Sequence, residues 1–186
     1  MIEQTVIETQ RLQLRPLELS DASAIQKVAS TREVADTMIS LPHPYPLGES
    51  ERYIARKQVE REVGRSITFI IEKKTEREFY GVIEVRDIDR EHSQGELSFW
   101  LVVEAWGMGY MSEVVQAVVR FGFEVLSLNR LYAYHMLRNQ ASSRIFEKNG
   151  FRQEGLLHQR VRKWGQYEDV ALWAILRQEW KTAIDN

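Results

Sequence analysis

The sequence predicts one domain of the α/β (α+β) class, in which helices flank a mixed, mostly antiparallel sheet of about seven strands. A length of 186 residues and a hydrophobic content of 44% suit a single core. Apolar side chains recur at every second position in three segments between residues 66 and 101, which is the period of strands. Over residues 112–126 the period becomes helical, and strand patterns then return. We therefore treat residues 1–186 as one domain.

The first quarter of the chain predicts a strand, two helices and a loop between them. Alternating apolar residues over 11–15 indicate a strand that a proline closes, and residues 20–21 are typical of a helix start. Three of the four prolines lie in residues 41–46. Each proline fixes its own φ and disfavours helix at the residue before it, so this segment is a loop. A polar helix is expected over residues 49–61.

The remainder of the chain contains no proline, so its elements can run without interruption. The polar residues of the helix expected at 112–126 form one narrow stripe, which predicts that most of this helix is buried. Asn149-Gly150 is the pair expected where a helix ends in a left-handed residue. The expected elements are an antiparallel meander of strands at 67–71, 79–85 and 97–101, the helix at 112–126, a strand at 131–136, a helix at 139–148, and a hairpin of 156–163 and 167–176.

Composition excludes several classes of function. The formal net charge is −2, from 25 basic and 27 acidic residues, so no overall field favours nucleic acid or an anionic membrane. The absence of cysteine removes disulfides and thiolate chemistry, and the four histidines show no metal-ligand spacing, so we expect no metal. No apolar run reaches the roughly 18 residues of a membrane helix, and the first residues lack a targeting pattern. We expect a cytoplasmic protein.

The segment with the clearest chemistry is residues 102–113, VVEAWGMGYMSE, where a strand leads through two glycines into a helix. Glycines allow backbone N–H groups to face a ligand, and a helix N-terminus carries about half a positive charge. A pyrophosphate would suit such a junction. The spacing of Gly107 and Gly109 by itself is equally compatible with a tight turn that binds nothing.

The order of several motifs resembles the GNAT superfamily of acetyltransferases, over nearly the whole chain. The motifs are ETQRLQLRP at 8–16, WGMGYMSE at 106–113, NQAS at 139–142 and FEKNGFRQEG at 146–155. The chain is most similar to the branch that acetylates N-terminal alanine or serine of ribosomal proteins. The resemblance implies a sheet splayed between its fourth and fifth strands, acetyl-CoA as cosubstrate, and direct attack of a primary amine on the thioester. The acceptor would be a protein N-terminus or a small amine, and the protein a monomer or homodimer.

The resemblance also implies which residues contact the coenzyme. Asn139 would contact the pantetheine arm, Ser142 the region of the sulfur, and Lys148, with Arg144 four residues earlier, the adenosine phosphates. Helix capping by Asn139 and Ser142, and a solvated helix face for Arg144 and Lys148, are the alternatives. The backbone contacts would come from Leu101, Val102, Val103, Trp106, Gly107, Met108, Gly109, Tyr110, Met111 and Ser112.

Catalysis requires a group that accepts the ammonium proton, donors for the oxyanion and an acid for the departing thiolate. Many members of the family use a tyrosine as the acid, but the matching residue here is Phe146, which leaves Ser142 as the nearest hydroxyl. Glu96 is the leading base, and Glu84 on the preceding strand is the second choice; either could instead be an outward-facing strand residue. The oxyanion donor would be an N–H group near Val103, where the family's strand carries a bulge.

Two other classes of function are alternatives to an acetyltransferase. A non-catalytic acyl-CoA sensor or interaction module would keep the coenzyme site without turnover. A kinase or nucleotidase is disfavoured because no Lys-Ser/Thr follows the glycines. For an acetyltransferase, the acceptor groove is expected to involve the loop at 41–46.

Overall fold

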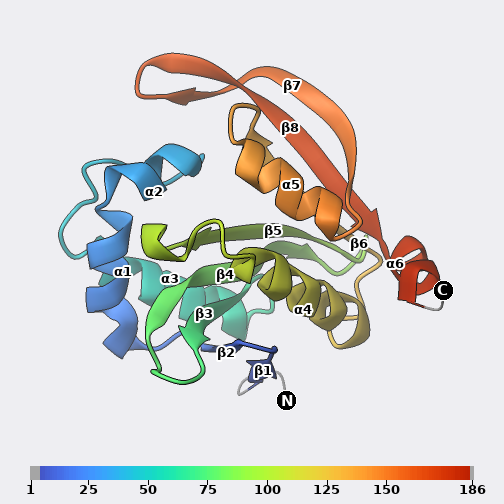
Figure 1. Ribbon diagram of the computed structural model, residues 1–186, viewed down its shortest axis with the longest axis horizontal. Helices are drawn as coiled ribbons and strands as arrows, with labels where there is room; N and C mark the ends of the chain where they lie inside the picture. The colour runs from blue at the N-terminus through green and yellow to red at the C-terminus, as the bar shows by residue number, and fades with distance from the viewer. Residues whose placement is uncertain (1–4, 185–186) are drawn as a thin grey trace.

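Eight strands form one sheet in the order β1-β2-β3-β4-β5-β6-β8-β7 in the computed structural model, which describes residues 5–184 (Figure 1). Every neighbouring pair is antiparallel except β5 and β6. The strands are β1 (Ile7–Glu8), β2 (Leu12–Pro16), β3 (Ile67–Lys73), β4 (Phe79–Asp89), β5 (Gln94–Leu101), β6 (Arg130–Met136), β7 (Arg152–Lys163) and β8 (Gln166–Leu176). The helices are α1 (Ala22–Ala29), α2 (Arg32–Thr37), α3 (Glu49–Glu62), α4 (Tyr110–Glu124), α5 (Gln140–Lys148) and α6 (Arg177–Ile184), with single 3-10 turns η1 (Leu19–Asp21) and η2 (Val103–Ala105).

The expected architecture, a mixed and mostly antiparallel sheet flanked by helices, is confirmed. The expectation of about seven strands is one short, because the two-residue strand β1 is too brief to show a period. The hairpin of β7 and β8 is longer than its sequence pattern indicated and projects past α5 toward α2 (Figure 1). The two short helices α2 and α6 were not expected.

In the central strands, apolar side chains point to both faces of the sheet. One face packs on α4, whose Val114, Val115 and Val118 are fully buried, as its narrow polar stripe predicts. The opposite face packs Ile70 and Val82 on α1 and α3. Burial of each of these side chains contributes about 1.5–3 kcal/mol.

The sheet opens between β5 and β6. These strands pair in parallel only from Gln94 to Glu96, opposite Arg130 to Tyr132. Beyond that point β5 stays paired with β4 through Leu101, whereas β6 continues along β8. Along residues 97–101 the edge of β5 therefore faces a slot, as the resemblance implied for the fourth and fifth strands of the family's fold.

The expected bulge near Val103 is not found. Strand β5 ends at Leu101, and Val103 lies in the turn η2. The Val102 amide donates to the carbonyl oxygen of Tyr80 in β4 at 2.8 Å, so β5 keeps its regular pairing to the end. The slot opens where β5 continues along β4 and β6 continues along β8, without an extra residue at the end of β5.

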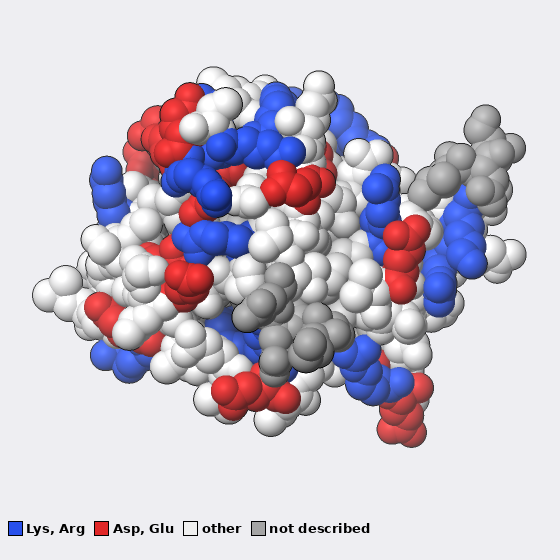
Figure 2. Space-filling model, turned by 90° about the horizontal axis from the view of Figure 1, so that it is seen from below, with Lys and Arg blue, Asp and Glu red and all other residues white. Residues whose placement is uncertain are grey.

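Two surface properties bear on function. On the face drawn in Figure 2, basic and acidic side chains are interspersed without one continuous basic region. Among residues 5–184, no helix combines the length and the apolar composition needed to span a membrane.

Candidate active site

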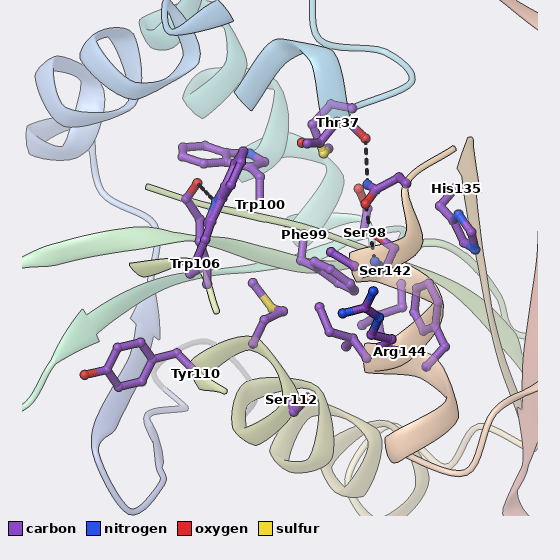
Figure 3. A pocket seen from close by; sticks show the side chains of 18 of the residues that line it. Thr37, Ser98, Phe99, Trp100, Trp106, Tyr110, Ser112, His135, Ser142 and Arg144 are labelled. Atoms are coloured by element: carbon purple, nitrogen blue, oxygen red, sulfur yellow. Dashed lines mark hydrogen bonds between the residues drawn. The ribbon is translucent and has the colours of Figure 1, made fainter. Parts of the chain in front are cut away.

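A pocket of about 340 Å³ passes through the slot between β5 and β6 (Figure 3). One end lies at the N-terminus of α4, one wall is α5, and the other end is bounded by the end of α2 and the residues after it. The lining residues are Thr37, Met38, Ile39, Ser40, Arg86, Glu96, Leu97, Ser98, Phe99, Trp100, Leu101, Ala105, Trp106, Gly107, Gly109, Tyr110, Met111, Ser112, Tyr134, His135, Asn139, Ala141, Ser142, Arg144, Ile145, Phe146 and Lys148.

The turn before α4 has the geometry of an anion site. Gly107 and Gly109 adopt φ values of +74° and +77°, which side chains with a Cβ rarely adopt. Gly109 is the N-cap of the fifteen-residue helix α4, and no side chain among the described residues caps it. The first amides of the helix are therefore left for another acceptor, and the helix dipole favours a negative one.

Arg11 fastens this turn to the start of β2. Its guanidinium donates to the Met108 carbonyl at 3.0 Å and to the Glu113 carboxylate at 2.7 Å, and it lies 4.2 Å from the centre of the Tyr110 ring. Thr9 also donates to Glu113, at 2.6 Å. Glu113 lies in the first turn of α4, where its charge would repel an anion. The ion pair with Arg11 offsets that charge, a role that no local sequence pattern indicated.

Most of the expected coenzyme residues line the pocket, but Val102, Val103 and Met108 do not. The amide of Val102 is engaged by Tyr80, and the side chains of Val103 and Met108 are exposed. Trp106 donates its indole N–H to the Leu101 carbonyl at 3.1 Å, and its ring lies beside Trp100 (Figure 3). The turn before α4 is therefore anchored to the sheet by a tryptophan.

Asn139 acts as the cap of α5. Its side chain accepts from the Ser142 amide at 3.3 Å and donates to the Thr37 carbonyl at 3.3 Å (Figure 3). It thus joins α5 to the end of α2 while it lines the pocket. The capping alternative holds for Asn139, and a contact with the coenzyme has to share the side chain with this role.

The hydroxyl of Ser142 has no hydrogen-bond partner among the described residues, and it lies on the pocket wall. Arg144 and Lys148 lie one turn apart on the same helix and also line the pocket. Both residues are exposed, as the solvated-face alternative expects, and both also border the pocket.

Phe146 is fully buried, and its ring lies 5.2–6.1 Å from the rings of four aromatic neighbours. These neighbours are Phe99, His135, Phe151 and Trp173. The position at which the family often carries a tyrosine is here part of the apolar core, and it has no proton to donate.

The two candidate carboxylates have different surroundings. Glu96 lines the pocket, and one of its oxygens accepts from the Arg86 guanidinium while the other has no partner among residues 5–184. Burial raises the pKa of Glu96 above its ordinary value, against the opposing effect of Arg86. Glu84 does not line the pocket. It accepts from Lys57 at 2.9 Å and from Thr68 at 3.3 Å, with Arg86 at 3.7 Å.

His135 is held as a neutral ring in a defined tautomer. Its Nδ1 lies 2.8 Å from the Met136 carbonyl oxygen and must therefore carry the proton. Its Nε2 then accepts from the Trp173 indole at 2.9 Å and from the Ser143 hydroxyl at 3.2 Å. Burial lowers the pKa of His135. Because Nε2 is occupied by two donors, the ring is unsuited to act as a base.

The state of His135 predicts a loss of stability in mild acid. In the unfolded chain a histidine titrates near 6.5, and in the folded protein the pKa is lower, so the unfolded state binds more protons between the two values. The contribution is fully present above about pH 6.5 and falls as the pH drops toward the folded pKa. We expect His135→Gln to flatten the fall in Tm between pH 7 and pH 5. The exposed His92 serves as the control, and an equal change in His92→Gln would contradict this assignment.

The far end of the pocket is formed by residues 37–40 rather than by the expected loop 41–46, of which no residue lines the pocket. The buried Lys163, at the tip of the β7–β8 hairpin, donates to the carbonyls of Met38 and Leu41 at 2.8 and 2.6 Å. Arg138 pairs with Asp36 at 2.9 Å. The segment after α2 is thus fixed in place by contacts remote in sequence, which the local pattern could not reveal.

Comparison with known proteins identifies the family to which this chain belongs. Residues 11–152 match the family model described as the acetyltransferase (GNAT) domain. The chain is a member of the GNAT family. It is 30% identical over 177 residues to an uncharacterized N-acetyltransferase, YoaA of Bacillus subtilis, across 92% of this chain and 97% of that protein. This GNAT protein is therefore an acetyl-CoA-dependent N-acetyltransferase, and membership in the family favours an enzyme over a sensor.

Two solved structures have the same fold. RimL, a ribosomal L7/L12 alpha-N-protein acetyltransferase in complex with coenzyme A, superposes with a TM-score of 0.86 at 20% identity, over 92% of this chain and 98% of that one. Spermidine N-acetyltransferase from Vibrio cholerae, in complex with CoA and spermine, superposes with a TM-score of 0.82 at 22% identity, over the same shares. At these identities the likeness establishes the fold and leaves the acceptor open.

Proposed function

We propose that this GNAT enzyme transfers acetyl directly from acetyl-CoA to the α-amine of a peptide or protein N-terminus. The observation that carries the choice of acceptor is the charge of the pocket. Among the described lining residues Glu96 is the one carboxylate, and it is already paired with Arg86.

The phosphates of the coenzyme suit the turn before α4. Gly107 and Gly109 leave the backbone unobstructed, and the amides that open α4 lack intrahelical partners. Arg144 and Lys148 supply positive charge on the facing wall. When bound, acetyl-CoA supplies an activated acetyl group, and the slot between β5 and β6 directs it toward Glu96.

Glu96 is proposed as the group that accepts a proton from the acceptor amine as its nitrogen attacks the thioester. Its second carboxylate oxygen lacks a partner among residues 5–184 and borders the pocket. The raised pKa brings it closer to the range in which a carboxylate exchanges protons efficiently near neutral pH. Glu84, the second choice, does not line the pocket and is paired with Lys57 and Thr68, which leaves Glu96 as the better candidate.

A polyamine acceptor is less compatible with this pocket. Spermidine carries several positive charges, and each buried cation needs a compensating carboxylate. The relatives include spermidine N(1)-acetyltransferases at 23–25% identity, and a pocket for spermidine would be expected to offer several acidic side chains. A peptide needs a single ammonium site, with the rest of its chain neutral beside Trp100, Trp106 and residues 37–40.

The acceptor can be identified with a thiol-release assay on matched amines. We expect peptides that begin with alanine or serine to release coenzyme thiol with a kcat/KM at least about tenfold above that for spermidine or spermine. Mass analysis should find the acetyl group on the α-amine. A preference for spermidine, or acetylation confined to lysine side chains, would contradict the proposed acceptor while it left acetyl transfer intact.

A further inference from the structure

The reaction needs a proton for the departing thiolate, and neither Phe146 nor Ser142 carries a group well matched to this role. Phe146, where the family often has a tyrosine, is buried among other aromatic rings. Ser142 lines the pocket, but an aliphatic hydroxyl does not titrate in the accessible range, whereas a phenol, with an ordinary pKa near 10, is matched to a thiol near 8.5. A phenol on the pocket wall would therefore be a better acid than Ser142.

Two tyrosines line the pocket, at different ends. Tyr110 opens α4 at the phosphate turn, where its ring packs against Tyr80 and Arg11. In Figure 3 it lies at the side of the pocket far from Ser142. Tyr134 lies in β6, on the other side of the slot from β5. Tyr134 is thus the phenol at the reacting end.

The position of Tyr134 follows from the strand register. Tyr132 is paired with Glu96 in the short parallel ladder, and the two tyrosine rings contact each other at 5.8 Å on one face of β6. Two residues further along each strand, Tyr134 and Ser98 stand on opposite sides of the slot after the strands have parted. The side chain of Tyr134 is half-buried, and its hydroxyl has no hydrogen-bond partner among residues 5–184.

We propose that Tyr134 is the general acid of this enzyme. This assignment rests on the proposed function, the direct transfer of acetyl to an amine. The amine nitrogen forms a bond to the thioester carbonyl carbon, and its extra proton passes to Glu96. When the tetrahedral intermediate collapses, the C–S bond breaks and the sulfur takes the phenolic proton of Tyr134. The products are the amide and free coenzyme thiol, and the phenolate regains a proton from solvent.

The Tyr134→Phe variant tests this assignment because it removes only the hydroxyl. We expect the single-turnover rate to fall about a hundredfold, with unchanged acetyl-CoA affinity by calorimetry. A decline of the rate at alkaline pH is expected wherever a general acid must hold its proton, and we expect this decline in the wild type and not in the variant. Tyr132→Phe is the matched control, since it removes a hydroxyl from the same face of the same strand outside the pocket. It should keep the wild-type rate and pH profile.

Three outcomes would overturn the assignment. One is an unchanged single-turnover rate in Tyr134→Phe. The second is a higher KM for the amine with the alkaline decline retained, which would make Tyr134 a contact for the acceptor. The third is loss of the alkaline decline in Ser142→Ala instead. The assay uses whichever amine the wild-type enzyme acetylates, so a wrong choice of acceptor class is detected separately from a wrong acid.

Discussion

Gly109→Val should weaken acetyl-CoA binding by roughly a hundredfold. Gly109 has a φ of +77° and is the N-cap of α4, and a β-branched residue in that conformation costs on the order of 1–3 kcal/mol. A Cβ at Gly109 would meet only the Arg11 guanidinium, at 3.7 Å, so the protein itself can accommodate the atom. The substitution would instead obstruct ligand binding, because the added methyl groups cover the amides that a phosphate has to approach. Calorimetric titration with acetyl-CoA measures the effect.

Gly64→Val is the matched control for this variant. Gly64 has a similar φ of +72°, follows α3, and an added Cβ there would have no neighbour within 4 Å. The two variants should show a comparable fall in Tm, but only Gly109→Val should lose affinity for the coenzyme. Wild-type affinity in Gly109→Val would remove the phosphate site from this turn.

Glu96→Gln should lower kcat on the order of 10³-fold, with little change in acetyl-CoA affinity. The amide keeps the shape of the carboxylate but cannot accept the ammonium proton. Since burial raises the pKa of Glu96, the wild-type rate should fall as the pH drops through that raised value, because the carboxylate must be ionised to act. Rates measured from pH 5 to pH 9 would show this acidic decline in the wild type, and the residual rate of Glu96→Gln should lack it.

Glu84→Gln separates a catalytic role from a structural one. Its carboxylate compensates the buried Lys57, so its loss should lower Tm while kcat changes much less than in Glu96→Gln. The reverse pattern, with a large loss of kcat in Glu84→Gln and wild-type rates in Glu96→Gln, would transfer the role of base to Glu84.

The sequence alone was sufficient for the architecture and for the geometry of the turn before α4. Alternation over β3, β4 and β5 and the narrow polar stripe of α4 are local patterns that burial imposes on side chains. The pair Gly107 and Gly109 also reports a local property, since positive φ is a demand on single residues. Features of this kind can be read from neighbours in the chain.

Only the tertiary structure distinguished Glu96 from Glu84 as a candidate base. Both lie in central strands, but Glu84 is paired with Lys57 of α3, whereas Glu96 is paired with Arg86 of β4 and borders the pocket. The same holds for Phe146, which is core because the rings of Phe99, His135 and Trp173 from three strands surround it together with Phe151. It holds also for the attachment of residues 38–41 to Lys163. Local periodicity determines which face of an element is buried. The neighbours that a side chain meets, and therefore its charge state and its access to the pocket, depend on how distant segments pack together.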